Sequence, residues 1–247
     1  MKNKKKIYGI VGQNISYSFS PDYFKTKFKK LDLKNHKYKI FDIDNITEFD
    51  NIRLQKKVIG LNVTIPYKEQ VIPYLDKLNK HAKAIGAVNT ISVTKKGKTV
   101  GYNTDFIGFK KSLAPLLSPQ HKKALILGTG GASKAVAYAL KKLNIEYDFV
   151  SRTPNEFQFS YQDITQAVFS EYQIIINTTP IGTFPNVEQA PELNYAFFTP
   201  QHIAYDLVYN PTETKFLNLA KQHGAVCKNG YEMLALQAEK AWKIWNE

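Results

Sequence analysis

Two polar side chains and a lysine mark the stretch from Leu61 to Glu69, which reads LNVTIPYKE. Asn62 and Thr64 are two residues apart in an apolar segment, so the pleat of a strand places both on the same face. Pro66 ends the backbone ladder, and the following residues are typical of a helix start, which puts Lys68 near a helix N-terminus. Because the helix dipole disfavours a cation there, the position favours proton exchange. Lys68 is a candidate proton-transfer residue; the alternative is one more solvated surface lysine.

A glycine-rich turn stands at Leu125 to Val136, which reads LILGTGGASKAV. An apolar strand, three glycines and a helix follow one another, and this order lets the backbone approach a diphosphate at the N-terminus of the helix. Ser133 stands where the third glycine or alanine of the usual GxGxxG spacing would be. We predict a dinucleotide site, rather than a plain tight turn, whose contact residues are Gly128, Thr129, Gly130, Gly131 and Ala132.

The residues after the next strand indicate which dinucleotide is bound. An enzyme that uses NAD usually has Asp or Glu there to accept from the ribose 2′-hydroxyl, whereas this chain has Ser151, Arg152 and Thr153. A planar guanidinium suits a 2′-phosphate. The sequence therefore favours NADP over NAD. The alternative is that Arg152 is a surface residue without a role in binding the cofactor.

These candidate residues need a scaffold, and the first part of the chain alternates strand and helix patterns. Strands are expected at 6–12, 37–42, 58–65, 88–93 and 99–102, the last two as a hairpin at the edge of an otherwise parallel sheet. Helices are expected at 21–31, 46–52, 68–74 and 75–84. Ser20 is the expected N-cap of the first helix and Pro21 its first residue.

The pattern restarts after residue 104, which predicts a domain boundary. Helices are expected at 105–117, 133–143, 214–223 and 231–245, and strands at 124–127, 147–151, 174–177, 203–208 and 225–228. The stretch between 152 and 173 has no clear pattern. The predicted fold is α/β with two domains, an N-terminal mainly parallel α/β domain and a doubly wound Rossmann-type domain.

Composition limits the alternatives. The chain has 247 residues, 43% of them hydrophobic, and one cysteine, so a globular protein without an internal disulfide is expected. No run approaches a membrane span and no Cys/His cluster suggests a metal, so we expect a soluble cytoplasmic protein without a metal site. The net charge of +13 raises nucleic-acid binding, but the lysines are dispersed and the only arginines are Arg53 and Arg152. Small acidic ligands are the favoured partners.

Taken together, the motifs resemble those of shikimate dehydrogenases. The matching stretches span nearly the whole chain in the family's order: IVGQNISYSFSP, LNVTIPYKE, GAVNTI, GYNTDFIGF, LGTGGASKAV, SRT, INTTPIG, YDLVYNPTET and NGYEMLALQA. The resemblance implies a substrate domain of residues 1–104 plus 230–247 and a dinucleotide domain of residues 105–229. It also implies reduction of 3-dehydroshikimate to shikimate with NADPH, by a monomer or homodimer, in the pathway to aromatic amino acids.

The resemblance assigns roles residue by residue. Lys68 and Asp105 would be the catalytic pair, either of which could transfer the proton. The substrate residues would be Ser18, Ser20, Asn62, Thr64, Asn89, Tyr209 and Gln237. Further cofactor contacts would come from Thr178, Leu207 and Gly230.

Two rivals stay open. Glu156 stands where relatives often have a second arginine, which predicts a looser preference for NADP and keeps open a quinate/shikimate dehydrogenase that also accepts NAD. The other rival is a non-catalytic nucleotide-binding sensor on the same fold.

Overall fold

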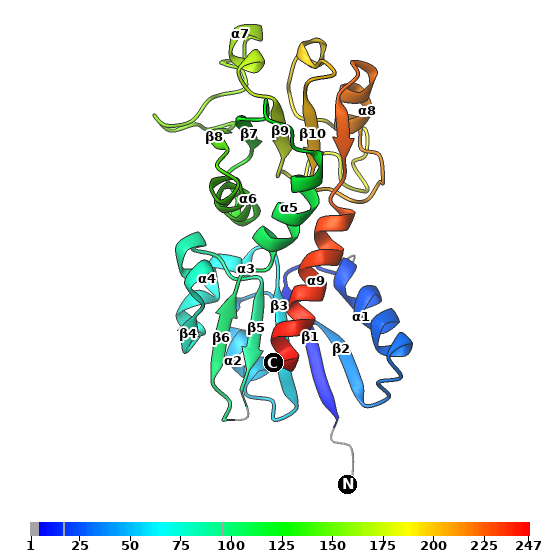
Figure 1. Ribbon diagram of the computed structural model, residues 1–247. Coiled ribbons are helices and arrows are strands. Elements are labelled where there is room, and N and C mark those ends of the chain that lie inside the picture. The colour runs from blue at the N-terminus through cyan, green and yellow to red at the C-terminus, as the bar shows by residue number, and fades with distance from the viewer. Residues whose placement is uncertain (1–4, 17, 95) are drawn as a thin grey trace. The chain divides into compact units, whose positions relative to one another are not determined.

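A computed structural model describes residues 5–16, 18–94 and 96–247; Tyr17, inside the SYSFSP motif, lies outside this range. The chain forms two compact units (Figure 1), one of residues up to Thr104 together with Gln237–Glu247 and one of Asp105–Leu236. Residues 230–236 lie in the second compact unit, whereas the resemblance implies that they belong to the substrate domain.

The first unit is built on a six-stranded sheet with the order β2-β1-β3-β5-β6-β4. Its strands are β1 (Lys6–Gly12), β2 (His36–Asp42), β3 (Val58–Val63), β4 (Lys77–Leu78), β5 (Thr90–Val93) and β6 (Thr99–Tyr102). Strand β5 runs antiparallel to β3 and β6, and the other pairings are parallel. The expected hairpin is thus present, but β4 forms the edge of the sheet. The prediction of a helix over 75–84 is wrong at β4, because two residues are too few to show a strand period.

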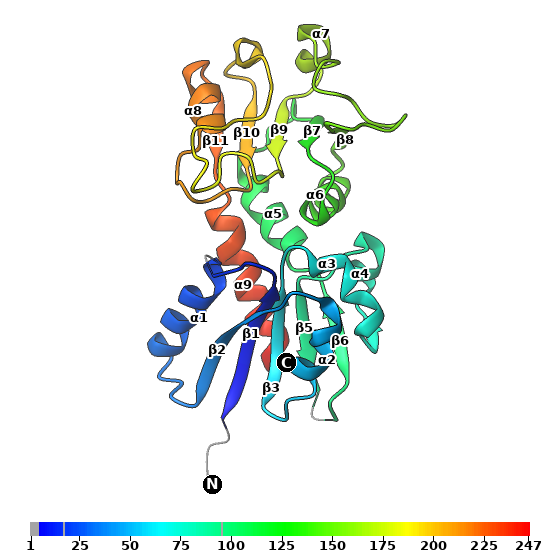
Figure 2. The ribbon, with the colours of Figure 1, turned by 180° about the vertical axis from the view of Figure 1, so that it is seen from behind.

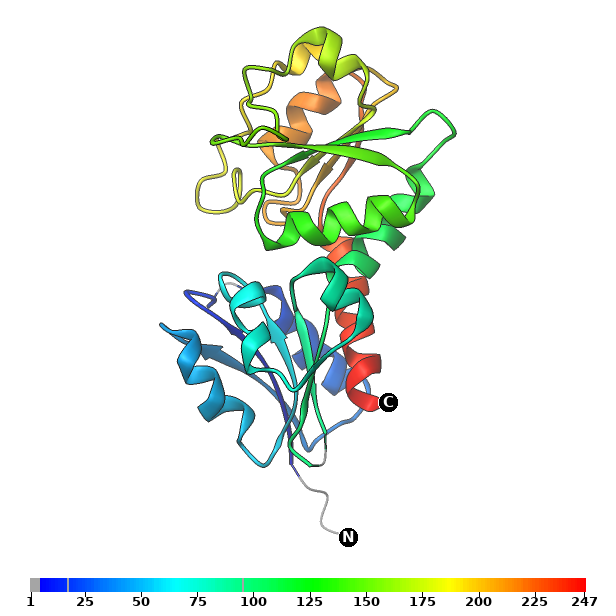
Figure 3. The same cartoon turned by 90° about the vertical axis from the view of Figure 1, so that its left-hand side faces the viewer.

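Helices cover both faces of this sheet. Helix α1 (Phe19–Lys30) and the end of α9 (Tyr231–Asn246) pack on one face in a cluster rich in aromatic rings. The opposite face is covered by η1 (Ile46–Glu48), α2 (Phe49–Arg53), α3 (Tyr67–Gln70), η2 (Ile72–Tyr74) and α4 (Lys80–Ile85). Figure 3 shows α9 in red and α2 in light blue on opposite sides of the strands.

Helix α1 begins earlier than expected. Its N-cap is Ser18, not Ser20, and Pro21 is its third residue. Proline fits there because the first-turn N–H groups have no partner within the helix in any case.

The second unit is a parallel five-stranded sheet with the order β11-β10-β9-β7-β8. Its strands are β7 (Lys123–Leu127), β8 (Glu146–Val150), β9 (Ile174–Asn177), β10 (Ile203–Asp206) and β11 (Val226–Lys228). The strand order reverses between β7 and β9, and ligands of such sheets bind at the carboxyl ends of the strands beside this switch point.

Helices lie on both faces of this sheet as well (Figure 2). Helices α5 (Asp105–Leu113) and α6 (Gly131–Lys142) pack together on one side, and Phe109 of α5 contacts the ring of Tyr205. Helices α7 (Gln166–Ser170) and α8 (Lys215–Gln222) bury Phe169 and Phe216 in the core on the other side. Short 3-10 turns complete the unit: η3 (Ala114–Leu116) and η4 (Tyr195–Phe197). None of the helices in the described residues is long and apolar enough to cross a membrane.

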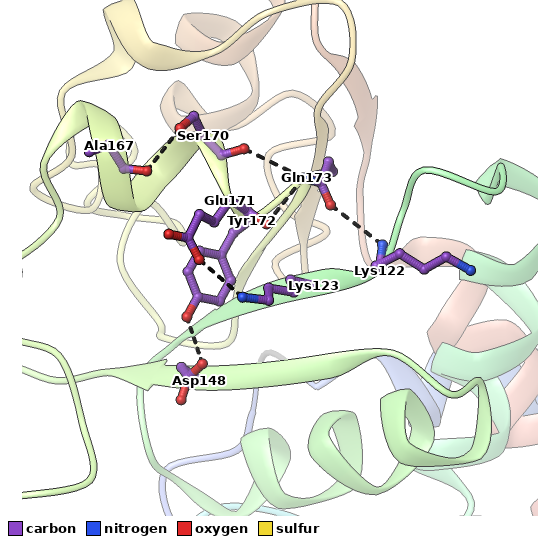
Figure 4. Close-up of polar contacts among 8 residues, drawn as sticks. All are labelled: Lys122, Lys123, Asp148, Ala167, Ser170, Glu171, Tyr172 and Gln173. Atoms are coloured by element: carbon purple, nitrogen blue, oxygen red, sulfur yellow. Dashed lines mark hydrogen bonds and ion pairs between the residues drawn. The ribbon is translucent and has the colours of Figure 1, made fainter.

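Polar contacts fix α7, which lies in the stretch without a sequence pattern (Figure 4). The ammonium of Lys123 donates to Glu171 at 3.0 Å, and the hydroxyl of Tyr172 donates to Asp148 at 2.7 Å. Lys123 stands at the start of β7, at the opposite end of that strand from the glycine turn. We therefore assign these contacts to stability.

Candidate functional site

The first unit holds a cluster of amide and hydroxyl groups where strands end. It consists of Asn62 on β3, Asn89 and Thr90 at the start of β5, Thr104, and Gln237 on α9. All five are buried, with Asn62 4%, Asn89 3% and Gln237 5% exposed. Buried polar groups are costly unless they are hydrogen-bonded, so the bonds within the cluster decide its shape.

Asn89 is the centre of the cluster. Its amide nitrogen donates to Thr104 Oγ1 at 3.0 Å and to Gln237 Oε1 at 3.3 Å, and its amide oxygen accepts from the Thr104 N–H at 2.6 Å. Asn62 donates to the Asn89 carbonyl at 3.2 Å and to Thr90 Oγ1 at 3.3 Å. The structure thus brings together three of the predicted substrate residues. It adds Thr90 and Thr104, which sequence reasoning missed because single threonines beside a turn give no signal.

Ser18 and Ser20 stand at the N-terminus of α1. Ser18 is the N-cap, yet its side chain makes no cap hydrogen bond, and Ser20 is buried in the first turn. The first N–H groups of a helix and its dipole favour an anion. The pair of hydroxyls therefore suits a carboxylate.

Lys68 is the second residue of α3, as expected near a helix start, and its side chain is half-buried. Its carbonyl accepts from the Val88 N–H at 2.7 Å, which ties α3 to the residue preceding Asn89. Thr64 follows β3 and is also half-buried. Asp105 is buried at the first position of α5 in the second unit. Its pairing with Lys68 stays a prediction.

The glycine turn of the second unit follows β7 at the switch point. Gly128 has a φ of +98°, and an added Cβ would lie 2.8 Å from Thr179 Cγ2. Only glycine fits that conformation and that space. Thr129 lies exposed between the glycines, Gly130 is the N-cap of α6, and Gly131 and Ala132 are its first two residues, so the helix begins two residues before the expected Ser133.

Ser133 closes this turn from within. Its side chain is buried, and its hydroxyl donates to the Gly130 carbonyl at 2.6 Å. The departure from the usual glycine spacing is therefore accommodated by a serine that bonds back to the turn. Beside it, Thr178 donates its N–H and its hydroxyl to the Leu127 carbonyl, at 3.0 and 2.6 Å.

A buried carboxyl group supports the neighbouring strand ends. Asp206 accepts from Asn177 Nδ2 at 3.0 Å, from the Val208 N–H at 2.9 Å and from Thr214 Oγ1 at 2.6 Å. Asn177 in turn accepts from Thr179. The network holds the loops that carry the predicted residues Thr178 and Leu207, and it lies close in sequence to Tyr209.

Gly230 faces the same loop. Its N–H donates to the Val208 carbonyl at 3.1 Å, and an added Cβ would lie 2.1 Å from the Leu207 carbonyl oxygen. The backbone approach therefore leaves no room for a side chain.

The buried carboxyl of Asp206 leads us to predict that the stability of the fold depends on pH. Burial raises the pKa of its carboxyl from 3.8 to about 7, against the opposing effect of its hydrogen bonds. Because the folded pKa lies above the unfolded one, the stabilisation is complete below about pH 4 and is lost as the pH rises through about 7, by up to about 4 kcal/mol. Asp206→Asn removes this titration, so the advantage of the wild type over the variant shrinks from pH 5 to pH 8. Urea unfolding followed by circular dichroism at both pH values measures it.

Asp163→Asn is the matched control, because hydrogen bonds from Ser160 lower the pKa of the exposed Asp163 carboxyl, the opposite direction. An unchanged difference between wild type and Asp206→Asn across this range would contradict the prediction.

Arg152 follows β8 and is exposed, and it lines a cavity of about 500 Å³. The other charged groups lining it are Lys215, Glu188 and Glu192. The hydroxyl of Ser151 accepts from the Thr153 N–H at 3.2 Å, which turns the chain after the strand. Two cations at the carboxyl edge of the sheet suit a phosphate, while the two carboxylates moderate that preference.

Comparisons with known proteins agree with the two-unit α/β fold. Residues 10–91 match the model of the shikimate dehydrogenase substrate binding domain. A shikimate dehydrogenase (NADP(+)) from Clostridium botulinum is 38% identical over 248 residues, covering 96% of this chain and 95% of the relative.

Two solved structures are similar over almost the whole chain. The shikimate dehydrogenase of Aquifex aeolicus is 36% identical with a TM-score of 0.87, covering 100% of this chain and 94% of that one. The enzyme of Thermus thermophilus, solved with NADP(H) and shikimate, is 30% identical with a TM-score of 0.85, covering 97% and 93%. The chain belongs to the shikimate dehydrogenase family.

Proposed function

We propose that this protein is an NADP-dependent shikimate dehydrogenase that reversibly reduces 3-dehydroshikimate to shikimate, in the cytoplasm, as a step toward aromatic amino acids. The buried cluster around Asn89 carries the proposal, because amide and hydroxyl groups gathered at strand ends recognise a small polyhydroxylated acid by oriented hydrogen bonds. In this proposal the partner is a small molecule, neither nucleic acid nor membrane takes part, and the enzyme is a monomer or a homodimer.

The substrate residues divide by chemistry. Ser18 and Ser20 bind the carboxylate, where the N-terminus of α1 adds its dipole. The ring hydroxyls contact Asn62, Thr64 and Asn89. Tyr209 and Gln237 complete the substrate site. The side-chain oxygen Oε1 of Gln237 accepts from Asn89 Nδ2 and from Thr104 Oγ1, which fixes the orientation of its amide.

The reaction needs a proton at the substrate oxygen. NADPH held by the glycine turn and Arg152 would supply the hydride for the ketone carbon. The ammonium of Lys68 stabilises the developing alkoxide and, as a pair with Asp105, exchanges the proton with it. Asp105 is buried at the first position of α5.

The second unit fits the cofactor. The cofactor diphosphate contacts the turn of Gly128, Thr129, Gly130, Gly131 and Ala132, which leads into the N-terminus of the twelve-residue helix α6. An added Cβ at Gly130 would meet no atom within 4 Å, so this side of the turn has room for a ligand. The 2′-phosphate end of the cofactor contacts Ser151, Arg152 and Thr153. The nicotinamide end contacts Thr178, Leu207 and Gly230.

A spectrophotometric assay tests the proposal. With shikimate as substrate, reduction of the cofactor at ~340 nm should be faster with NADP⁺ than with NAD⁺, because Arg152 and Lys215 attract a 2′-phosphate. We also expect some activity with NAD⁺. The preference for a 2′-phosphate is moderated by Glu188 and Glu192 in the same cavity and by Glu156 in the neighbouring loop. Equal rates with both cofactors would contradict the NADP assignment.

Two further arms of this assay separate the rivals. Quinate in place of shikimate tests the quinate/shikimate dehydrogenase, which would turn over both substrates. A nucleotide-binding sensor would bind NADPH, as measured by calorimetry, without turnover of either.

A further inference from the structure

One hydroxyl group outside the predicted site contacts a member of it. Tyr38, on β2, donates its hydroxyl to Asn62 Oδ1 at 2.7 Å, and the side chain of Ser20 lies beside the same hydroxyl. We propose that Tyr38 is a positioning residue for substrate binding, whose hydroxyl fixes the amide of Asn62 in the orientation that the substrate meets. This inference rests on the proposed function.

The position of each hydrogen follows from the chemistry of the groups. An amide oxygen only accepts, so the single hydrogen of Tyr38 goes to Asn62. Burial raises the pKa of Tyr38 well above its usual range, so the hydroxyl stays protonated and keeps this direction at physiological pH.

The consequence for Asn62 is a fixed amide plane. With Oδ1 bound to Tyr38, its Nδ2 faces the Asn89 carbonyl and Thr90 Oγ1. Without the Tyr38 donor, a buried amide oxygen is left unpaired, and the amide can rotate by half a turn to seek another partner. A ligand hydroxyl that hydrogen-bonds to Asn62 would then meet the wrong atom of its amide.

Packing against other aromatic rings fixes the position of the Tyr38 ring. Its ring stacks on Phe24, with centroids 4.7 Å apart and planes 11° apart, and Trp245 lies at 6.5 Å. Phe24 follows Ser20 by one helical turn, so α1 presents both to Tyr38 from one face. A Tyr38→Phe change keeps this packing and removes only the hydroxyl.

The chain offers a matched control. Tyr8 is the partner of Tyr38 in the register of β1 with β2 and belongs to the same aromatic cluster. It is fully buried, and within the described residues its hydroxyl has no hydrogen-bond partner. Tyr8→Phe therefore removes a hydroxyl from the same environment without touching the proposed site.

Steady-state kinetics of the full chain tests the proposal. Tyr38→Phe should raise the KM for shikimate about 5- to 30-fold, the effect of one lost hydrogen bond to a buried polar group. The kcat and the KM for NADP⁺ should change less than about threefold, and Tyr8→Phe should leave all three unchanged. In an Asn62→Ala background the effect of Tyr38→Phe on KM should fall below about twofold, since the group it orients is gone.

The outcomes distinguish a failure of the proposed function from a failure of the positioning role of Tyr38 alone. A wild type without turnover of shikimate would overturn the proposed function and this inference with it. An active wild type with an unchanged KM in Tyr38→Phe, with or without a lower melting temperature, would overturn the positioning role alone. A KM increase of the same size in Tyr8→Phe, or in the Asn62→Ala background, would also overturn it.

Discussion

Replacing Lys68 with alanine is expected to lower kcat by ~100-fold or more, the usual size of a lost general acid or base. The ammonium at this position is the group that we assign to the reacting oxygen, and its contribution is made in the transition state, so the KM for shikimate should change little. The loss corresponds to about 2.7 kcal/mol of transition-state stabilisation or more. Initial rates at saturating shikimate and NADP⁺ measure it.

A second lysine gives the control for this variant. Lys83 is exposed on α4 in the same unit, and Lys83→Ala removes the same charge from the surface. Its kcat should match the wild type, which separates proton transfer from the general effect of net charge. A normal kcat in Lys68→Ala would end the catalytic assignment of this lysine.

Replacing Trp245 with alanine is expected to destabilise the first unit by about 3–5 kcal/mol, the usual cost of removing a large buried aromatic side chain. Trp245 is 8% exposed and packs 5.1 Å from both Tyr8 and Phe24. Its indole N–H donates to the Ile91 carbonyl at 3.0 Å. Gly60 lies under the ring, and an added Cβ there would be 2.4 Å from it, so the strand accepts the indole only because it has a glycine at this place.

Urea unfolding measures this loss through Trp242, the other of the chain's two tryptophans. Trp242 belongs to the same aromatic cluster, so its fluorescence reports on the first unit. Lys243→Ala, an exposed change on the same helix, should leave the midpoint unchanged. A change below about 1 kcal/mol in Trp245→Ala would show that α9 is held by other contacts.

Local patterns predicted most of the elements because their causes are local. The apolar strands and the helix after the glycine turn follow from side-chain periodicity. The errors lie where several local signals compete: Ser18 and Ser20 are both good N-caps, and the turn geometry selects Ser18, whose N–H donates to the Ile15 carbonyl. Strand β4 and helix α7 are too short for a period to show.

The site residues also divide into those that a local sequence pattern predicts and those that it does not. Asn62 was visible from sequence because a polar residue interrupts a buried strand. Tyr38 was not, because β2 alternates lysines with larger residues and its tyrosine has the look of an ordinary strand residue. Its role depends on β1 lying between β2 and β3, so that a long side chain reaches across one strand to Asn62. Such a contact arises from sheet order, which no local pattern contains.

The return of the chain to its first unit has a consequence during synthesis. The sheet of that unit is complete by Tyr102, yet α9, which covers its aromatic face together with α1, follows the whole of β7 to β11 in the chain. The second unit, Asp105–Leu236, is continuous in sequence and has all of its residues earlier. Domains usually fold on the ribosome in the order of their synthesis. Here the later unit can finish first, while the aromatic face of the earlier sheet has α1 but still lacks α9 until Trp245 leaves the exit tunnel.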